Sequence, residues 1–345
     1  MPSPRIDLRS DTVTLPSTAM RAAMAAAELG DDQYGEDPTV NRLQALCAEL
    51  LGKPAALWLP SGTMANQVAI RTMTRPGDEV VVSRECHTAW HEAGATHANA
   101  GVQLNEIGRG GHFSSEEFVA AIKPQGMPIF APTTLVALEN THNRAGGVVL
   151  DQAEVQRICA AARERGLRSF LDGARLWNAA VASGHSEADL AAPFDLVAVA
   201  FSKGLGAPGG SLLAGSRELI AAATRQRRML GGAMRQAGVL AAAALFGLEH
   251  LRSRLAEDHA NARMLGEQLA ASQAVQLDLA TVQTNIVVFD LAPGAPDAPT
   301  LVARARERGV WLNAFAARKV RAVTHLDVSE AQVRQAAAVL LELLA

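Results

Sequence analysis

The feature that most constrains the fold of this chain is the alternation of short apolar segments with helical segments between about residues 55 and 215. Apolar stretches such as "DEVVVS" and "FDLVAVAF" alternate with segments such as "DQAEVQRICAAARERG", which have the period of an amphipathic helix. Strands that are apolar along their whole length are typical of a sheet covered on both faces. The pattern therefore predicts an α/β domain with a mostly parallel central sheet.

The alternation weakens after about residue 215, where an Ala/Leu-rich helical region runs from Arg217 to about Leu269. The tail then returns to strands, in "TNIVVFD" and "AVTHLDV", with helical segments between and after them. A chain of 345 residues is long enough for two domains. We expect a large domain over residues 1–250, which includes the N-terminal segment and a connecting helix, and a small α+β domain over residues 251–345.

Composition excludes several classes of function. The net charge is −3, no long basic block occurs and Tyr34 is the only tyrosine, which argues against a nucleic-acid partner. No apolar run reaches membrane-spanning length, and "MPSPRIDLRSDTV" lacks the apolar core of a signal peptide. Three widely spaced cysteines without a C-x-x-C pair fit a reducing compartment, so we expect a cytoplasmic protein with no membrane partner.

The stretch "SKGLGAPGG" contains a formal G-x-G-x-x-G at Gly204, Gly206 and Gly209. It can be a dinucleotide-binding turn, a flexible loop or the surroundings of a functional Lys203. A dinucleotide turn needs a helix that opens on its last glycine and an acidic residue about 20 positions later. Pro208 interrupts the turn, "SLLAG" after it is typical of a strand, and no acid stands at the required distance. The pattern thus argues against a nicotinamide site.

Lys203 and Asp172 each follow an apolar strand, "DLVAVAF" and "LRSFL" respectively. Sites in open α/β sheets gather at the carboxyl ends of strands, so both side chains are expected to face one crevice, although a salt bridge at the rim explains the pair equally well. Ser61-Gly62-Thr63 begins a helical segment whose free N–H groups favour a phosphate, unless Thr63 is only an N-cap. A lysine, an acid and a phosphate cradle are the attachments that pyridoxal phosphate needs.

Eight segments of the chain resemble the L-threonine aldolase family, whose members are fold-type-I pyridoxal-phosphate enzymes grouped with the β-eliminating lyases. The matches run in family order from Ile6 to Ser329. The resemblance implies a transferase-like α/β large domain of fold type I with a small α+β C-terminal domain, and pyridoxal 5'-phosphate as the cofactor. The segments are "IDLRSDTVTLP", "GDDQYGEDPTVNRLQ", "SGTMANQ", "LENTHNRAGG", "FLDGARLWNA", "SKGLGAPGG", "RRMLGGAMRQAG" and "RAVTHLDVS".

The resemblance also implies roles for individual residues of the cofactor site. Lys203 matches the lysine that forms the Schiff base, and Asp172 of "DGAR" matches the partner of the pyridine nitrogen. Arg175 of the same motif is expected near the cofactor's phenolic oxygen and the substrate carboxylate. Gly62 and Thr63 match the phosphate-binding turn.

Further positions follow from the same resemblance. Ser202 is an additional expected cofactor contact, and His87 of "ECHTAWHEAG" matches the histidine that stacks on the cofactor ring. His87 and His91 are four residues apart, but no third ligand suggests a metal, and we expect none. Ser10 and Arg321 match positions that bind the substrate carboxylate. Residues that reach the site of a neighbouring subunit are matched by Tyr34, Arg228 and Arg235, which implies a homo-oligomer, usually a tetramer built from dimers.

The activity implied by the resemblance is retro-aldol cleavage of L-β-hydroxy-α-amino acids, such as threonine, allo-threonine and phenylserine, to glycine and an aldehyde. His87 would take the β-hydroxyl proton directly or through water. Several family members carry a histidine before "LENTHN", near the substrate hydroxyl, where this chain has Ile129. A hydrophobic residue there predicts a roomier apolar pocket that accepts phenylserine. Two rival classes remain: another fold-type-I lyase or aminotransferase, and a non-catalytic phosphate-binding protein.

Overall fold

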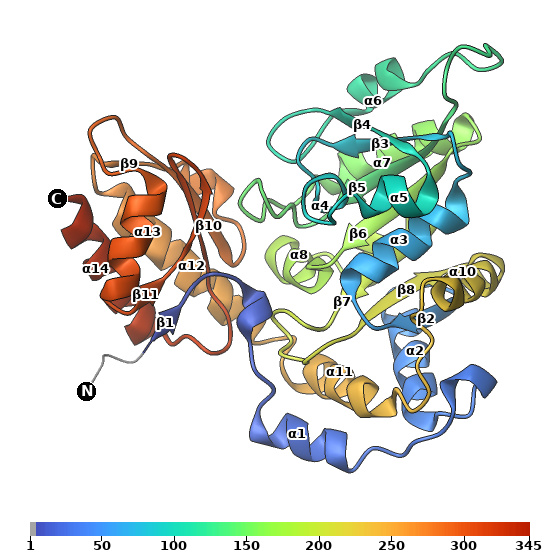
Figure 1. Ribbon diagram of the computed structural model, residues 1–345, viewed down its shortest axis with the longest axis horizontal. Coiled ribbons are helices and arrows are strands. Elements are labelled where there is room, and N and C mark those ends of the chain that lie inside the picture. The colour runs from blue at the N-terminus through green and yellow to red at the C-terminus, as the bar shows by residue number, and fades with distance from the viewer. Residues whose placement is uncertain (1–4) are drawn as a thin grey trace.

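The computed structural model describes residues 5–345 and has a large domain built on a seven-stranded sheet and a smaller C-terminal domain beside it (Figure 1). The strand order in the large sheet is β2-β8-β7-β6-β5-β3-β4, and β8 alone runs antiparallel to its two neighbours. This confirms the mostly parallel sheet. The strands are β2 (Ala55–Leu59), β3 (Glu79–Ser83), β4 (Gln103–Ile107), β5 (Thr133–Glu139), β6 (Arg168–Gly173), β7 (Leu196–Ala200) and β8 (Ser211–Gly215).

Both faces of this sheet are covered by helices, because successive strand residues point to opposite sides and both sides are apolar. Val80 and Val82 of β3 pack in one core with α3 and α10, whereas Val81 packs in the other core with α2, α7, α8 and α11. The helices of this domain are α1 (Thr18–Ala25), α2 (Pro38–Leu50), α3 (Gly62–Met73), α4 (His87–Trp90), α5 (Ala95–Ala100), α6 (Ser115–Ala121), α7 (Gln152–Glu164), α8 (Leu176–Ser183), α9 (Glu187–Ala191), α10 (Arg217–Met229) and α11 (Gly238–His250).

The N-terminus of α3 begins as the sequence suggested, with one correction. Ser61 is the N-cap, and its Oγ accepts a hydrogen bond of 3.2 Å from the backbone N–H of Met64. Thr63 already lies inside the helix, so the interpretation of Thr63 as a mere N-cap is wrong. The N–H groups of the first helical turn therefore point out of the helix, where an anion can bind them.

The small domain has an antiparallel sheet of order β12-β13-β10-β9, packed against α12 (Leu255–Ala270), α13 (Ala298–Glu307) and α14 (Glu330–Leu344). Its strands are β9 (Val275–Gln276), β10 (Ile286–Leu291), β12 (Asn313–Ala316) and β13 (Lys319–Val323). The first strand of the chain, β1 (Ile6–Asp7), pairs in parallel with β11 (Val310–Trp311), and Ile6 and Leu8 are buried in the same core. The N-terminal segment is therefore divided between the two cores, because Ile6 and Leu8 pack with the small domain, whereas Met20 of α1 packs in the core of the large domain.

The helical region expected from Arg217 to Leu269 consists of three helices rather than one connecting helix. A turn with Gly231 at φ 78° separates α10 from α11, and a short non-helical segment separates α11 from α12. Among residues 5–345, no helix combines the length and the apolar character that crossing a membrane would require.

Candidate active site

Lys203 lies in the loop that follows β7, at the carboxyl edge of the sheet. Its backbone carbonyl accepts hydrogen bonds from the Thr14 hydroxyl and from the N–H of Gly206, which fixes the residue from two sides. Its Nζ makes no hydrogen bond with any residue from 5 to 345. Burial, together with the charge of Arg175, lowers the pKa of the Lys203 amine to about 8. An unpaired amine with this pKa is available as a nucleophile near neutral pH.

The glycines after Lys203 serve this turn and do not begin a helix. Gly206 has φ 72° and Gly210 has φ 103°, a region that side chains with a Cβ rarely adopt. Gly210 leads directly into β8, where a dinucleotide fingerprint would require a helix. The prediction that "SLLAG" forms a strand is confirmed, and this turn therefore lacks the helix of a dinucleotide-binding fingerprint.

Asp172 stands near the end of β6, the strand next to β7. The strand period places it on the same face as Phe170, which packs in the core that contains α3. One carboxylate oxygen therefore meets Asn66 of α3, whose Nδ2 donates at 2.8 Å, and the other accepts from the N–H of Ala174 at 3.1 Å. Burial and the charge of Glu139 raise the pKa of Asp172, so a cation placed beside this carboxylate would be strongly stabilised.

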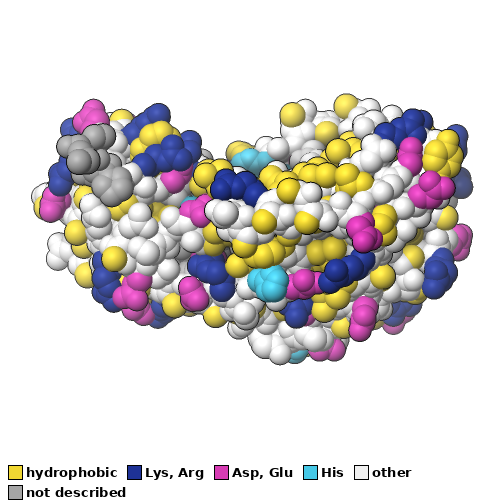
Figure 2. Space-filling model, turned by 90° about the horizontal axis from the view of Figure 1, so that it is seen from below, with side chains coloured by type: hydrophobic (Ala, Val, Ile, Leu, Met, Phe, Trp, Pro, Cys, Tyr) yellow, Lys and Arg dark blue, Asp and Glu magenta, His cyan; other side chains and the backbone are white. Residues whose placement is uncertain are grey.

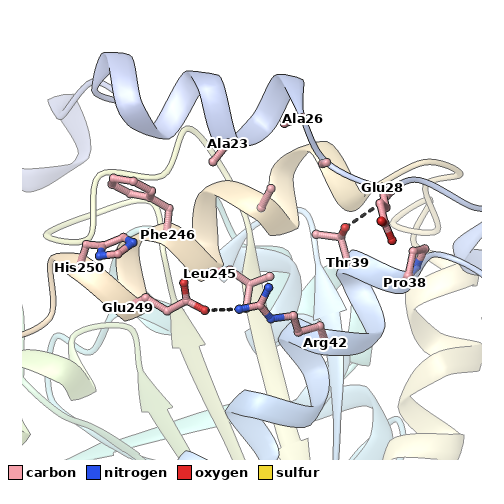
Figure 3. Close-up of a pocket in the computed structure, with 12 residues that line it drawn as sticks. Ala23, Ala26, Glu28, Pro38, Thr39, Arg42, Leu245, Phe246, Glu249 and His250 are labelled. Atoms are coloured by element: carbon pink, nitrogen blue, oxygen red, sulfur yellow. Dashed lines mark hydrogen bonds and ion pairs between the residues drawn. The ribbon is translucent and has the colours of Figure 1, made fainter.

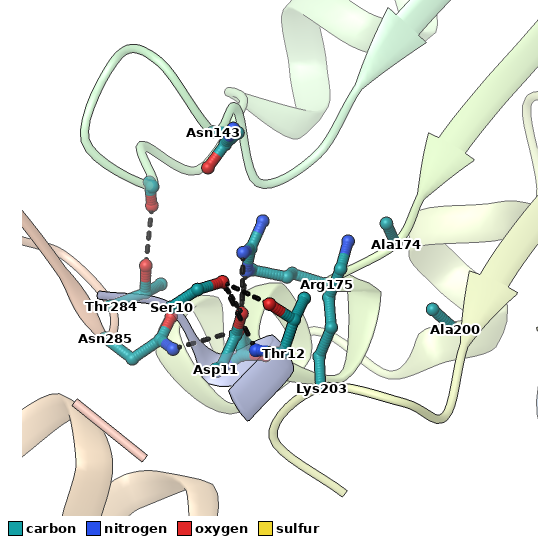
Figure 4. Close-up of polar contacts among 12 residues, drawn as sticks. Ser10, Asp11, Thr12, Asn143, Ala174, Arg175, Ala200, Lys203, Thr284 and Asn285 are labelled. Atoms are coloured by element: carbon teal, nitrogen blue, oxygen red, sulfur yellow. Dashed lines mark hydrogen bonds and ion pairs between the residues drawn. The ribbon is translucent and has the colours of Figure 1, made fainter. Parts of the chain in front are cut away.

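Arg175 forms a buried two-pronged ion pair with Asp11 that fixes the guanidinium plane. Nε and Nη2 donate to the two Asp11 oxygens at 2.7 and 2.8 Å, and Asn285 of the small domain donates to the same carboxylate at 3.2 Å. Nη1 has no partner within the described part of the chain. Figure 4 shows the Arg175 and Lys203 side chains extending in the same direction, with Asn143 beyond them. One donor edge of Arg175 therefore remains for an anionic ligand.

His87 begins α4, just after β3, and its backbone N–H donates to Glu139 at 2.7 Å. Its ring Nδ1 is 2.8 Å from a carboxylate oxygen of Glu92, whose side chain is completely buried. Burial opposes the charged imidazole, but the hydrogen bond to Glu92 and the charge of Asp172 outweigh it, so the pKa of His87 is raised. The arrangement resembles that of a general base held by an orienting carboxylate.

The start of α3 supplies the third part of the site. The backbone N–H groups of Gly62 and Thr63 bind no acceptor among residues 5–345, and a Cβ built on Gly62 would meet nothing within 4 Å. Ser202, directly before Lys203, likewise leaves its hydroxyl without a hydrogen bond in the described chain. Pyridoxal phosphate requires an anion site for its phosphate, an amine for its aldehyde and a carboxylate for its ring nitrogen. The open helix N-terminus with the neighbouring hydroxyl, the free amine and the buried carboxylate supply these groups, so the residues fit this cofactor.

The two positions expected to bind a carboxylate lie near this centre. Arg321 of β13 is buried, and it donates from Nη1 to Asn143 at 2.6 Å and from Nη2 to the carbonyl of Arg9 at 2.9 Å. Burial and the charge of nearby Arg175 lower the pKa of Arg321 to about 10. Ser10 caps the short 3-10 helix Asp11–Val13, and its hydroxyl accepts from the Thr12 hydroxyl at 2.8 Å. Ser10 thus lies beside Asp11, the partner of Arg175 (Figure 4), and Arg321 is close enough to both members of this pair to feel their charges.

Tyr34, Arg228 and Arg235 do not belong to this centre, but they lie together on the surface. Arg228 and Arg235 both donate to the Gln33 side chain at 2.7 Å, and the neighbouring Tyr34 is 71% exposed. Segments some 200 residues apart thus form one exposed cluster of polar and aromatic side chains.

Ile129 does not line the site of its own chain. It is 75% exposed in the loop between α6 and the first residue of β5, whereas the site lies at the last residue of that strand. Seven residues of extended chain separate the two edges of the sheet by about 20 Å. The expectation that Ile129 widens the substrate pocket of the same subunit is therefore wrong.

Sequence reasoning missed several residues that shape the site. Asp11 stands beside Ser10 in "LRSDT", but only the fold brings it to Arg175. Glu92 follows His87 at five positions, a spacing that carries no recognisable metal or catalytic signature. Asp11 reaches Arg175 across 164 positions, whereas Glu92 is close to His87 in sequence but is turned toward it by the loop after α4. The one available signal in the sequence was that an acidic residue stands near an assigned one.

A separate cavity of about 570 Å³ lies between α1, α2 and α11 (Figure 3), and Lys203 is not among the residues that line it. Alanines of α1 and the Leu245 and Phe246 side chains give it an apolar wall, and Arg42 pairs with Glu249 at 2.6 Å on its rim. No lysine, strand-end acid or open helix N-terminus is among its lining residues, so it is not the centre of the chemistry.

A lysine and an aspartate on neighbouring strand ends, facing an open helix N-terminus, define a fold-type-I pyridoxal-phosphate enzyme. Comparison with known proteins agrees. The sequence profile of the beta-eliminating lyase family matches residues 7–292. Low-specificity L-threonine aldolases of Escherichia coli O157:H7 and Arabidopsis thaliana are 44% and 38% identical to this chain over 335 and 333 residues. These alignments cover 96% and 95% of this chain and 97% and 93% of the relatives.

Solved structures support the same fold. A threonine aldolase from Leishmania major superposes with a TM-score of 0.83 at 22% identity and covers 98% of this chain and 99% of its own. A serine palmitoyltransferase from Sphingomonas wittichii superposes with a TM-score of 0.76 at 20% identity and covers 98% of this chain and 87% of its own. The chain belongs to the beta-eliminating lyase family, and the two relatives described above, which it matches over nearly their full length, are low-specificity L-threonine aldolases.

Proposed function

We propose that this protein is an aldehyde-lyase that uses pyridoxal 5'-phosphate to cleave L-β-hydroxy-α-amino acids, threonine among them, to glycine and an aldehyde. The observation that carries the proposal is the unpaired Lys203 amine, which shares one buried centre with Asp172 and His87. Full-length similarity to low-specificity L-threonine aldolases gives the substrate class.

Different residues of the chain would bind different parts of the cofactor. The N–H groups of Gly62 and Thr63, with Ser202, would hold the phosphate, and Lys203 would hold the cofactor through its amine. Asp172 would keep the pyridine nitrogen protonated. Bound in this way, pyridoxal phosphate supplies an electron sink for the electrons of a bond at the substrate Cα.

Other side chains select which bond breaks. The free edge of Arg175, with Arg321 and Ser10, would bind the substrate carboxylate and so fix the direction of the Cα–Cβ bond. The Nε2 of His87, which faces away from Glu92, would accept the β-hydroxyl proton as this bond breaks and the aldehyde forms. Return of a proton to Cα completes glycine, so atoms and charges balance without a further reactant.

A product assay separates this reaction from its rivals. Glycine and an aldehyde in equal amounts support retro-aldol cleavage, whereas ammonia and a keto acid would identify another lyase or an aminotransferase of the same fold. Loss of the visible absorption of the bound cofactor in Lys203→Ala, with the fold intact, would exclude a non-catalytic phosphate-binding protein.

An aromatic ring of the small domain, Phe315, lies beside the site and supports a substrate range that includes phenylserine. The Phe315 ring lies 4.4 Å from the guanidinium of Arg321 and 6.4 Å from the ring of His91. Phe315→Ala is expected to lower kcat/KM for L-phenylserine more than for L-threonine. Ile129→Ala, a change in the loop at the other edge of the sheet, serves as the matched control; equal losses for both substrates in Phe315→Ala would refute the assignment.

Assembly into a homotetramer is part of the proposal. The exposed cluster of Tyr34, Arg228 and Arg235 supports it, since these side chains gather around Gln33 on the surface and form no hydrogen bond or ion pair with Lys203, Asp172 or Arg175 of the described chain. Apolar side chains also gather on the face of the large domain seen in Figure 2, over α1 and α11. Sedimentation analysis tests the state, and Tyr34→Ala should lower activity without changing the cofactor spectrum.

Two further assignments complete the proposal. We place the boundary between the domains between α11 and α12, near residues 250 and 251; Leu248 of α11 packs in the core of the large domain and Ala262 of α12 in that of the small domain, while Leu255 at the start of α12 still contacts the large-domain core. A cytoplasmic location is supported by three cysteines, Cys47, Cys86 and Cys159, all of which are buried and unpaired.

A further inference from the structure

The carboxylate of Glu92 is held in a dense set of hydrogen bonds beside the catalytic histidine. Oε1 accepts from Asn66 at 2.7 Å and lies 2.8 Å from His87 Nδ1, while Oε2 accepts from Gln67 at 2.6 Å. An ionised carboxylate has no proton to donate, so Glu92 must accept a hydrogen bond from His87 just as it does from the two amides. The proton of this hydrogen bond therefore sits on Nδ1 of the imidazole. The unprotonated nitrogen of neutral His87 is then Nε2.

Asn66 links this pair to the cofactor's expected partner. Its Nδ2 donates one proton to Glu92 and the other to Asp172 at 2.8 Å. The opposite orientation of the amide would set an oxygen against both carboxylates, so the network itself fixes Asn66. Side-chain atoms of His87, Glu92 and Asp172 all lie within 4.8 Å of one another, which makes them one electrostatic unit.

The backbone after α4 is bent to bring Glu92 inward. Ala93 has φ 52° and Gly94 has φ 77°, so two successive residues adopt the left-handed conformation directly after Glu92. For alanine this conformation costs about 1 kcal/mol, and such residues persist where surrounding contacts determine them. Glu92 itself is 3% exposed, and the turn places its carboxylate where it forms the three hydrogen bonds with Asn66, Gln67 and His87.

We propose that Glu92 is a positioning residue, which sets the tautomer of His87 so that Nε2 is the base, and which Asn66 couples to Asp172. Glu92 would not touch substrate; it would act through His87, as the orienting carboxylate of a catalytic triad does. The role in catalysis rests on the proposed retro-aldol function, whereas the tautomer of His87 does not.

The charge of Glu92 is one of several that His87 faces. Besides Glu92, the ionisable groups around it are Glu139 at the end of β5, Asp172 at the end of β6, Lys203 after β7 and His91 at the end of α4. Glu92 is the one of these that hydrogen-bonds the ring, and its removal should leave the charges of the others in place. Neutralising Glu92 therefore lowers the pKa of His87, and the base stays unprotonated to a lower pH.

The experiment uses the holoenzyme with ¹⁵N-labelled histidine and the variant Glu92→Gln. In the wild type, the ¹⁵N shifts of His87, assigned by their absence in His87→Gln, should show a protonated Nδ1 and a bare Nε2. In Glu92→Gln, kcat should fall about tenfold to a hundredfold, which does not exceed the rate enhancement that a general base contributes. KM should change less than about twofold. The acidic limb of the kcat/KM profile should move to lower pH.

Glu79→Gln is the matched control, because Glu79 is a buried, hydrogen-bonded glutamate at the start of β3, at the far edge of the sheet. It should change neither the acidic limb nor the His87 shifts. A bare Nδ1 in the wild type would overturn the proposal, and this measurement needs no variant to fold. An unmoved acidic limb in a folded Glu92→Gln would overturn it too, leaving Glu92 as an anchor for the turn. Absence of aldolase activity in the wild type would refute the function but not the tautomer.

Discussion

Replacing Asp11 by asparagine should destabilise the protein strongly, although the two side chains have nearly the same shape. Asp11 is fully buried, and it receives Arg175 Nη2 on one oxygen and both Arg175 Nε and Asn285 on the other. Asparagine can accept on one side only, because its amide nitrogen would face a second donor. Arg175 would then remain buried without a carboxylate hydrogen-bonded to its guanidinium.

The magnitude follows from the burial. Removing one partner of a buried ion pair costs about 3–5 kcal/mol, and the single acceptor that asparagine retains places the loss near the lower end. At a urea dependence of about 3 kcal/mol per molar, the unfolding midpoint of Asp11→Asn should fall by about 1 M.

The same pair gives a pH dependence whose sign is fixed. Burial alone would raise the pKa of Asp11, but the charge and hydrogen bonds of Arg175 outweigh it and hold the pKa below its ordinary value of 3.8. A carboxyl with a lowered pKa stabilises the fold fully above its unfolded value, and this stability is lost as the pH falls toward the folded value. The difference in unfolding free energy between wild type and Asp11→Asn should therefore be constant from about pH 5 to pH 8 and shrink below about pH 4.

Asp297→Asn is the control, since Asp297 caps α13 at the surface and asparagine caps equally well, so its effect should stay within about 0.5 kcal/mol. Equal midpoints for wild type and Asp11→Asn at neutral pH would refute the reasoning, as would a difference that persists unchanged into acid.

Three further outcomes are expected. Cofactor loading into the cofactor-free protein, followed by its visible absorption, should speed up as the pH rises through about 8, because the Lys203 amine must lose its proton before it reacts; a pH-independent rate would contradict the lowered pKa. Arg321→Lys should raise the KM of the amino acid about tenfold or more, because lysine cannot keep both the hydrogen bond to Asn143 and the one to the Arg9 carbonyl. Gly173→Ala should cost about 1–3 kcal/mol in a urea titration, since its Cβ would lie 2.6 Å from the Ala198 carbonyl oxygen; an unchanged midpoint would show that β6 and β7 separate easily.

The large sheet could be predicted from the sequence because its signal is local. Segments such as "DEVVVS" are apolar at every position, and that property decides both that they form strands and that helices cover both faces. The pairing of Ile6 with Val310 has no such signal, since a strand of two residues shows no period. The same applies to the breaks between α10, α11 and α12, which the uniform Ala/Leu composition conceals.

The same distinction between local and non-local signals decides which site residues could be predicted from the sequence. Lys203 and Asp172 could be placed together because the carboxyl ends of neighbouring strands share one edge. Asp11, Asn66 and Glu92 could not, because each reaches the centre by a contact that only the folded chain creates. Ile129 was misplaced for a related reason: thirteen residues before His142 is a short distance in sequence, but the chain crosses the whole width of the sheet in between.

The parallel pairing of β1 with β11 has a consequence for the order in which a newly made chain can become active. Asp11 meets Arg175 164 positions later and Asn285 274 positions later. At about 5–20 residues per second, the ribosome adds Asn285 roughly 15–55 s after it adds Asp11. The seven-stranded sheet can form well before then, since its last strand ends at Gly215. In a nascent chain the strands that carry Lys203 and Asp172 can therefore pair while Asp11 still lacks Asn285, so that synthesis of the small domain, rather than folding of the sheet, completes the contacts around Asp11.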